Sequence, residues 1–396
     1  MLSWLFEDNP VTFRDIDHSV IGKPVLYILK ECASFVGRRD HRKDMSALKE
    51  HLDNARVICD VAWEHINTGH WKCVNICWRR LYSYGALFKS YIEVLIGEHL
   101  TDALKTCDLG LIMGAPIMGN VLTEVAKEIH SHLNLDIQLM KLKRMVTKHA
   151  HIAAEATSFP IARVECPSVE KFMSEHLNRE TPAVITKAID YWPAMTTRQW
   201  SVEYILRCAG GRTVPIEVGA KYTDETWSQT LMTIADFVEQ YMLGDKVSDE
   251  IGYLAQHQLF DQIPELKEDI STPIYCCLSE KDEEPDTNVW FGPKGTTSPL
   301  HHDPKHNLLT QMFGEKYVRL YSKEQTEFLY PHEGHLLENT SQVDIENPDL
   351  DKFPHFSQAK YTECVLGPGE MLYIPPKCWH FVRSLSPSMS LSFWWE

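Results

Sequence analysis

The spacing of apolar residues changes near residues 150–160, and this change constrains the fold more than any other feature of the sequence. From about residue 24 to that point, apolar residues recur every three or four positions, which is typical of amphipathic helices. The clearest segments are Met45–Ile66, Trp71–Ile96 and Val121–Leu142. Helix-breaking residues are sparse there. We therefore predict an α-helical N-terminal domain over residues 1–155.

Beyond Phe159-Pro160 the sequence changes to short runs of β-branched and aromatic residues bounded by proline and glycine. Such runs predict strands, which we expect at Ala183–Thr186, Thr213–Val218, Asn288–Phe291, Lys316–Tyr321, Glu363–Leu366 and Ser388–Trp394. Two helical patches, Val169–Leu177 and Thr233–Met242, lie between them. Many short strands separated by turns indicate a barrel or a sandwich. We therefore predict an α+β chain whose second domain covers residues 156–396.

The composition is that of a soluble globular protein. Hydrophobic residues make up 44% and charged residues 24% of the 396 positions, and no apolar run reaches the roughly 18 residues that a membrane helix needs. The opening MLSWLFEDNP lacks the basic and apolar regions of a secretory signal. Eleven cysteines without such a signal fit reduced thiols better than a disulfide framework. We expect an intracellular protein without a membrane partner.

The balance of acidic and basic residues indicates which class of molecule the protein binds. The chain has 39 basic and 55 acidic side chains, which give a net charge of −16. This excess of negative charge argues against broad binding to a phosphate backbone, so we expect no direct nucleic-acid partner. A basic polypeptide suits the field better.

A histidine and an aspartate lie two positions apart in Ser298-Pro-Leu-His-His-Asp-Pro, which contains His301 and Asp303. On an extended strand both side chains would project from the same face. A second histidine, His380, follows in Gly367-Pro-Gly-Glu-Met-Leu-Tyr-Ile-Pro-Pro-Lys-Cys-Trp-His-Phe. Two imidazoles and one carboxylate are the ligand set of non-haem iron(II) oxygenases, which leaves positions open for a co-substrate and O₂. The sequence therefore predicts an Fe²⁺ site at His301, Asp303 and His380.

A His-x-Asp triplet is weak evidence by itself, because a chain with 19 histidines contains such triplets by chance. The alternative is that these are ordinary polar residues at the end of a strand. The long run of sequence around His380 makes chance much less attractive. A nucleophilic pair of Cys378 and His380 is a weaker alternative, because adjacency in sequence does not make the geometry of a catalytic triad.

Other histidines are not expected to bind the metal. His302 lies between the two predicted ligands and should face the opposite side of a strand. The pairs His130/His132 and His149/His151 occur in helical or linker sequence, where residues two apart do not share a face.

These motifs resemble the Jumonji C (JmjC) branch of the cupin superfamily. The resemblance covers residues 160–396, through the run Tyr-Leu-Ala-Gln-His-Gln-Leu-Phe at Tyr253, Pro-Leu-His-His-Asp-Pro at Pro299 and the closing Ser-Phe-Trp-Trp. It extends more loosely through the helical half. It implies a double-stranded β-helix, a jelly-roll barrel whose mouth holds the metal. It also implies an Fe(II)- and 2-oxoglutarate-dependent dioxygenase.

The resemblance further implies which residues bind 2-oxoglutarate. Lys316 matches the lysine that pairs with the distal carboxylate, although composition alone would place a lysine on the surface. Tyr253, Ser298 and Asn307 match positions that hydrogen-bond the carboxylates, and Trp394 matches a pocket-lining tryptophan. The alternative for these four residues is a place in the core or in turns.

Three more residues match the substrate pocket of the resembling family: Glu217, Trp227 and Trp290. Taken by pattern alone, Glu217 would face solvent and the tryptophans would belong to the core. A carboxylate that grips a guanidinium with two oxygens, beside an indole stacked on its plane, is the expected way to recognise arginine. We therefore hypothesise that these residues orient a substrate arginine.

Three functions stay open at this point. The first is hydroxylation of an arginine side chain in a protein or peptide substrate. The second is demethylation of a methyl-lysine in the histone H3 tail, which the absence of a recognisable zinc or reader module disfavours. The third is a scaffold that acts through the helical domain. The resemblance also implies a role in chromatin and cell-cycle regulation. We expect the protein in the nucleus and also in the cytoplasm, although Arg38-Arg39 is too short for a convincing nuclear import signal.

Overall fold

The structure is a computed structural model that describes residues 2, 4–6, 11–38, 44–97, 99–133, 158–219, 227–242, 251–279, 281, 283–334 and 337–396. The chain divides into two compact units. One comprises Met1–Ile137, Ala209–Val214 and Asp261–Pro264, and the other comprises Gln138–Cys208, Pro215–Phe260 and Glu265–Glu396. The predicted boundary at residue 155 and the pair His149/His151 lie outside the described residues. In the described part, no helix combines the length and apolar character needed to cross a membrane.

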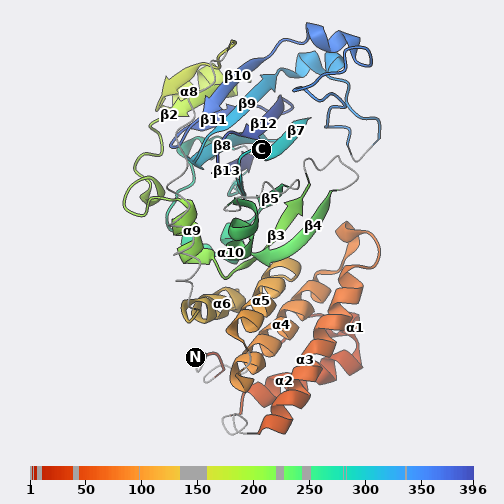
Figure 1. Cartoon of the computed structure of the whole chain (residues 1–396). Helices are drawn as coiled ribbons and strands as arrows, with labels where there is room; N and C mark the ends of the chain where they lie inside the picture. Colours follow the sequence, from red (N-terminus) through yellow and green to blue (C-terminus); the bar gives the residue numbers. More distant parts are fainter. Residues whose placement is uncertain are drawn as a thin grey trace. The chain divides into compact units, whose positions relative to one another are not determined.

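The first unit is built from successive helices (Figure 1), as the spacing predicts. They are α1 (His18–Ile21), α2 (Lys23–Val36), α3 (Met45–Ile66), α4 (Ile76–Ile96), α5 (Leu100–Met113) and α6 (Val121–Ser131). Asp44 caps α3 by accepting hydrogen bonds from the backbone N–H groups of Ser46 and Ala47. Asn75 caps α4 in the same way, which is why this helix begins at Ile76, and Trp71–Cys73 forms a separate 3₁₀ turn. Residues 134–142 of the third predicted helix lie outside the described residues.

Two glycines let α3, α4 and α5 approach closely. A Cβ atom at Gly85 of α4 would lie 2.7 Å from Sγ of Cys59 in α3. A Cβ atom at Gly110 of α5 would lie 2.7 Å from Cβ of Ala86 in α4. Real Cβ atoms do not approach other atoms so closely, so any larger residue would force these helices apart.

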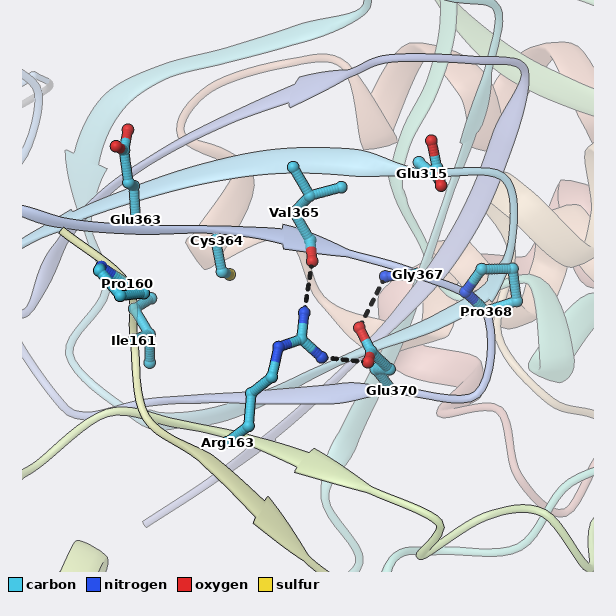
Figure 2. Close-up of a pocket in the computed structure, with 10 residues that line it drawn as sticks. All are labelled: Pro160, Ile161, Arg163, Glu315, Glu363, Cys364, Val365, Gly367, Pro368 and Glu370. Atoms are coloured by element: carbon cyan, nitrogen blue, oxygen red, sulfur yellow. Dashed lines mark hydrogen bonds and ion pairs between the residues drawn. The ribbon is translucent and has the colours of Figure 1, made fainter. Parts of the chain in front are cut away.

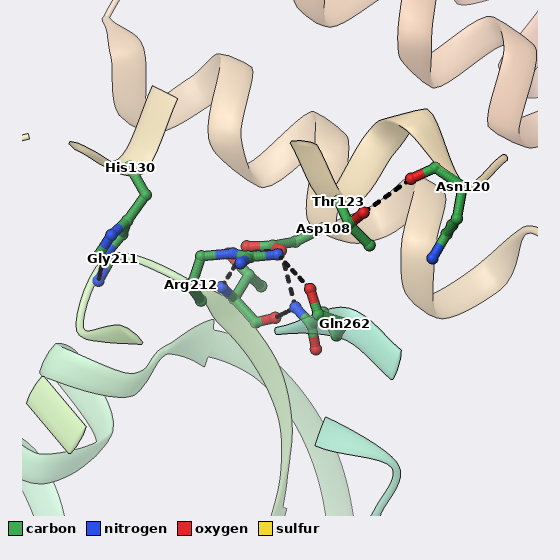
Figure 3. Close-up of polar contacts among 8 residues, drawn as sticks. Asp108, Asn120, Thr123, His130, Gly211, Arg212 and Gln262 are labelled. Atoms are coloured by element: carbon green, nitrogen blue, oxygen red, sulfur yellow. Dashed lines mark hydrogen bonds and ion pairs between the residues drawn. The ribbon is translucent and has the colours of Figure 1, made fainter. Parts of the chain in front are cut away.

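A buried ion pair is the polar centre of this unit (Figure 3). Asp108 of α5 and Arg212 are 0% and 2% exposed, and Arg212 Nη2 lies 2.7 Å from Asp108 Oδ1. The Thr213 N–H and Gln262 Nε2 also donate to the Asp108 carboxylate, at 2.6 and 2.8 Å. Removing one partner of such a pair costs about 3–5 kcal/mol because the other charge stays buried. Thr213 is the first residue of the strand that carries Glu217.

The second unit is formed by two sheets (Figure 1). In the described residues, the larger has the order β1-β2-β11-β8-β13-β6-β5-β3-β4 and the smaller β10-β9-β12-β7. The strands are β1 (Arg163–Glu165), β2 (Ala183–Thr186), β3 (Thr213–Val218), β4 (Ser228–Thr233), β5 (Gly252–His257), β6 (Asp286–Gly292), β7 (Thr297–His302), β8 (His306–Phe313), β9 (Lys316–Tyr321), β10 (Thr362–Leu366), β11 (Met371–Ile374), β12 (Trp379–Ser384) and β13 (Ser388–Trp395).

Short helices connect some of these strands. They include α8 (Val169–Phe172), α9 (Val202–Ala209), α10 (Ile234–Phe237), α11 (Leu259–Gln262) and α12 (Pro264–Lys267). π-Helical turns extend α8 over Met173–Leu177 and α10 over Val238–Met242, so both predicted helical patches are confirmed. All six predicted strands are present as well. β2, β3 and β9 have the predicted bounds, and β6, β10 and β13 extend slightly beyond them.

An apolar core joins the two sheets. Leu309 of β8 and Leu372 of β11 in the larger sheet belong to the same buried cluster as Val318 of β9 and Leu366 of β10 in the smaller. Strands β8 and β13 are buried along almost their whole length. In β8 polar and apolar residues do not alternate, so the period-two pattern of a half-buried strand is absent from its sequence. The predicted α+β class, with helices followed by a domain of two packed sheets, is confirmed.

Candidate metal centre

Strand pairing brings the three predicted metal ligands together. β12 runs antiparallel to β7, and His380 lies directly opposite His301. The two imidazole ring centroids are 4.2 Å apart, and His380 Nε2 lies 3.6 Å from Asp303 Oδ2. One ligand atom from each of His301, Asp303 and His380 lies within 4.8 Å of the others. This group can hold a metal ion.

Backbone carbonyls orient both imidazoles. Nδ1 of His301 lies 2.7 Å from the Pro299 carbonyl, and Nδ1 of His380 lies 3.0 Å from the Cys378 carbonyl. A carbonyl only accepts, so each Nδ1 carries a hydrogen, and in the neutral form of each ring Nε2 keeps its lone pair. Burial, helped by the neighbouring His301, lowers the pKa of His380 to about 4, although Asp303 opposes this shift. The His380 ring is therefore neutral at pH 7, as a metal ligand must be.

The aspartate is placed differently from the expectation of a shared strand face. β7 ends at His302, so Asp303 lies one residue beyond the strand. Its backbone carbonyl accepts a hydrogen bond of 2.7 Å from the Lys377 N–H, which ties it to the turn before β12. The His302 ring lies edge-on to Trp379, with ring centroids 4.6 Å apart, and is not part of the metal-competent group.

Lys316 lies at the start of β9 and is 1% exposed, so the surface alternative for it is wrong. Its Nζ donates hydrogen bonds to Ser390 Oγ at 2.6 Å and to Tyr253 Oη at 3.2 Å. Burial lowers the pKa of Lys316 to about 7. Among the described residues no carboxylate pairs with this ammonium. A buried cation with only hydroxyl partners indicates a site for an anion.

Two further buried polar atoms near Lys316 lack partners within the described residues. They are Oδ1 of Asn307, which is 4% exposed, and Nε1 of Trp394. Trp394 of β13 lies opposite Asn307 of β8 in the strand register. Burial raises the pKa of Tyr253, so its phenol stays protonated and can donate. Because buried polar groups are normally hydrogen-bonded, these atoms fit a polar ligand that carries donors or acceptors to this place.

The predicted substrate residues lie beside this group. Glu217 of β3 is directly opposite Tyr253 of β5. Trp227 Nε1 donates to Glu217 Oε2 at 3.3 Å. Burial raises the pKa of the Glu217 carboxyl, and the hydrogen bond from Trp227 opposes that shift. The Trp290 ring lies 6.0 Å from the Tyr253 ring, and its Nε1 donates to Ser392 Oγ at 2.8 Å.

Comparison with known protein families shows the family to which the chain belongs. A family model described as "Cupin-like domain" matches residues 169–396, more than half of the chain. A second model, described as "KDM8-like, N-terminal ARM repeats", matches residues 31–141. The chain belongs to the JmjC family. JmjC cupin-like domains are Fe(II)- and 2-oxoglutarate-dependent oxygenases, and the helical unit consists of ARM repeats.

Three relatives show how far the similarity extends. Lysine-specific demethylase 8 of Danio rerio is 49% identical over 358 residues, covering 87% of this chain and 87% of that protein. Lysine-specific demethylase 8 of Xenopus tropicalis is 43% identical over 396 residues, covering 86% and 87%. Jumonji C domain-containing protein 5 of Drosophila melanogaster is 36% identical over 391 residues, covering 96% of each chain. The similarity therefore includes both the ARM repeats and the JmjC barrel.

The JmjC pocket gathers most of the predicted site residues. It is lined by Tyr253, Trp290, Ser298, His301, Asp303, Asn307, Lys316, His380 and Trp394, together with Leu309, Ile374, Val382 and Ser392. Glu217 and Trp227 are not in its lining but adjoin it through Tyr253. The cavity volume among these side chains is about 30 Å³.

A larger cavity of about 330 Å³ lies elsewhere on the barrel (Figure 2). Its lining includes Arg163, Glu315, Glu363 and Glu370. Glu370 is paired with Arg163 and accepts the Gly367 N–H at 2.9 Å, so its charge is already compensated. By size, this cavity would be the better candidate for the active site. The JmjC pocket is the better candidate by chemistry, because it contains the three possible metal ligands and the buried polar groups without partners.

Sequence reasoning missed two serines that contact the predicted site. Ser390 and Ser392 of β13 accept hydrogen bonds from Lys316 and Trp290. The available signal was the alternation in Ser388-Met-Ser-Leu-Ser, three serines at every second position of an otherwise apolar strand. An alternating polar row in a buried strand indicates a polar interior face.

Proposed function

We propose that this JmjC protein hydroxylates an arginine side chain of a protein substrate. The observation that carries the proposal is the half-buried Glu217 carboxylate, which lies opposite Tyr253 and accepts a hydrogen bond from the Trp227 indole. A planar guanidinium can pair with both carboxylate oxygens while its face stacks on an indole. Trp290, on the other side of Tyr253, offers a second indole. The net charge of −16 favours a basic polypeptide.

In this proposal His301, Asp303 and His380 hold Fe²⁺, and the lone pairs left on the two Nε2 atoms fit that role. A bound Fe²⁺, with 2-oxoglutarate and O₂ as co-substrates, would supply the oxidation: one oxygen atom of O₂ would enter a C–H bond of the substrate, and the other would enter succinate as CO₂ leaves. The protein needs no acid or base side chain for this reaction. Its task is to hold the C–H bond within reach.

The co-substrate is held by a second set of residues in this proposal. Lys316 pairs with the distal carboxylate of 2-oxoglutarate, and Tyr253, Ser298 and Asn307 donate hydrogen bonds to its carboxylates. Trp394 closes the pocket. Support comes from the buried ammonium without a carboxylate partner among the described residues and from the unpartnered donor Nε1 of Trp394.

Demethylation of methyl-lysine is the second candidate, and the names of the relatives favour it, since two of them are called lysine-specific demethylase 8. A histone-tail substrate would place the protein in the nucleus, on chromatin. The two indoles could enclose a methylammonium by cation–π attraction. Glu217 distinguishes the candidates, because a carboxylate that offers two coplanar acceptors suits a guanidinium better than a methylated ammonium.

The deciding experiment offers two peptides of the same basic sequence, one with arginine and one with dimethyl-lysine at the central position. The protein is incubated with Fe²⁺ and 2-oxoglutarate, and both peptides are followed by mass spectrometry. We expect one oxygen atom to be added to arginine. Loss of a methyl group with release of formaldehyde from the other peptide alone would overturn the arginine proposal.

Two controls accompany this experiment. Omission of 2-oxoglutarate must abolish either product. The Asp303→Ala variant, which lacks the anionic metal ligand, must also form none. If the wild type changes neither peptide and consumes no 2-oxoglutarate, the scaffold function through the ARM repeats becomes the better explanation.

A further inference from the structure

Three serines form one row along β13. Ser388, Ser390 and Ser392 occupy alternate positions, so their side chains project from the same face of the strand, followed by Trp394. They are 0%, 0% and 1% exposed. Burying a hydroxyl group is unfavourable unless it is hydrogen-bonded, so a row of three requires a partner for each.

Ser390 acts on Lys316. Its Oγ accepts a hydrogen bond of 2.6 Å from Lys316 Nζ, and Tyr253 Oη accepts a second from the same ammonium. Lys316 lines the pocket, whereas Ser390 does not line it and lies behind the lysine. An ammonium has three N–H donors. With two of them held by Ser390 and Tyr253, the third is left for the carboxylate of a ligand.

Ser392 acts on Trp290 in the same way. Its Oγ accepts a hydrogen bond of 2.8 Å from Trp290 Nε1 and itself lines the pocket. An indole has a single N–H donor, so this bond fixes the direction of the polar edge of the ring. This hydrogen bond keeps the Trp290 ring beside Tyr253, whose strand neighbour is Glu217.

We propose that Ser390 and Ser392 are positioning residues for the two halves of the site: Ser390 holds Lys316 in place for 2-oxoglutarate, and Ser392 holds the Trp290 indole in place for the substrate side chain. Neither serine reacts. The part concerning Ser392 rests on the proposed role of Trp290 in substrate binding, whereas the part concerning Ser390 depends only on the co-substrate.

Ser388 offers a matched control within the same row. It is equally buried, but its hydroxyl donates to Ser384 Oγ at 3.0 Å, which belongs to neither half of the site. Ser388→Ala, Ser390→Ala and Ser392→Ala each remove one buried hydroxyl from one strand. If the row serves stability alone, all three variants should behave alike.

The first measurement is the dissociation constant of 2-oxoglutarate by calorimetry, with Mn²⁺ in place of Fe²⁺ so that no turnover occurs. Ser390→Ala should weaken binding about 10-fold, because the Lys316 side chain is then no longer held in place and must be ordered when the ligand binds. Ser392→Ala and Ser388→Ala should leave this constant unchanged. Equal weakening in all three variants would overturn the proposal.

The second measurement is the KM of the peptide that the wild type converts. Ser392→Ala should raise it about 3- to 10-fold with little change in kcat, as expected for a neutral hydrogen bond that orients a binding surface. Ser390→Ala and Ser388→Ala should not change it. If the wild type converts no peptide, the proposed function fails, while the calorimetric result for Ser390 still stands by itself.

A double-mutant cycle separates positioning from a general loss of packing. In a Lys316→Met background, Ser390→Ala should have no further effect on 2-oxoglutarate binding, because the group it orients is gone. In a Trp290→Phe background, Ser392→Ala should likewise have no further effect on the peptide KM. Additive effects in either cycle would show that the serine does not act through that partner.

Discussion

The two sides of the JmjC pocket are held in place by different means. On the metal side, backbone carbonyls of Pro299 and Cys378 orient His301 and His380, and strand pairing sets the imidazoles against each other. On the substrate side, half-buried side chains hold one another, as Trp227 does when it donates to Glu217 at 3.3 Å. Side chains that are oriented by backbone groups keep their positions as long as the fold is intact. Side chains that are oriented by other side chains can be displaced by a single substitution. In the proposed function, the metal side fixes the type of chemistry, and the side with Glu217 and Trp227 selects the target.

The two sides also differ in how many buried polar groups lack a hydrogen-bond or ion-pair partner. Lys316 and Asn307 are almost fully buried, and among the described residues the ammonium has no carboxylate partner and Asn307 Oδ1 has no partner at all. The buried ammonium costs stability in the free protein and favours binding of an anion. Glu217 on the substrate side already has a partner in Trp227. Substitutions on the metal side should therefore have larger effects than those on the substrate side.

The largest effect is expected from Asp303→Ala. Two imidazoles without the carboxylate should bind Fe²⁺ weakly, and 2-oxoglutarate turnover should fall by a factor of about 1,000 or more. Metal content by elemental analysis and succinate formation measure the two losses. His302→Ala is the matched control. Because the His302 ring lies against Trp379, this variant should keep its metal. Full metal content in Asp303→Ala would contradict the assignment of this site.

Lys316→Met should weaken 2-oxoglutarate binding about 100-fold, since the charge-assisted hydrogen bond to the distal carboxylate is lost. The same change should raise the thermal midpoint of the protein without ligand, because a buried ammonium is replaced by an apolar chain of similar length. Calorimetry and a thermal melt give the two values. A lysine that only stabilises the barrel would produce the opposite result in the melt.

Glu217→Gln should raise the KM of the arginine peptide about 10-fold and leave 2-oxoglutarate binding unchanged, because the amide keeps the shape of the side chain and loses its charge. Steady-state kinetics with each substrate varied in turn measures both effects. Glu165→Gln is the control, since it removes one equal charge from an exposed ion pair with Lys187. An equal change in both variants would mean that net charge alone matters.

The smallest effect concerns pH. Burial lowers the pKa of Lys316 to about 7, so above pH 7 the free site holds a neutral amine that must take up a proton when it pairs with a carboxylate. Binding of 2-oxoglutarate should therefore weaken with rising pH, about fivefold between pH 7 and pH 8. A Lys316→Arg variant stays charged and should lose this dependence. Flat binding in the wild type would show that Lys316 is charged throughout that range.

Glu217 should shift the peptide KM in the other direction. Burial raises the pKa of its carboxyl, so the free site keeps the neutral acid to a higher pH than an exposed glutamate does. A guanidinium pairs with the carboxylate, so the peptide KM should fall as the pH rises through this pKa. Comparing the pH profiles of the two KM values thus separates the two sides of the pocket within a single protein.

Much of the fold could be read from the sequence because its signals are local. The helical and strand periodicities of the two halves predicted the α+β class, and β2, β3 and β9 begin and end at the predicted residues. β8 was missed because its residues are buried on both faces and do not alternate. The triad could be proposed from two motifs because each motif is a short run of sequence.

Long-range contacts decided the rest. Composition alone would place Lys316 on the surface, and it is buried because β9, β5 and β13 surround it; its partner Ser390 is 74 positions away. Asp108 and Arg212 form a buried ion pair across 104 positions, which no local pattern indicates. By itself the sequence determined which half of the chain is helical, where several of the strands lie and which residues can bind a metal, because periodicity and residue chemistry are local properties. The tertiary structure decided burial and pairing, because these depend on which distant segments pack together.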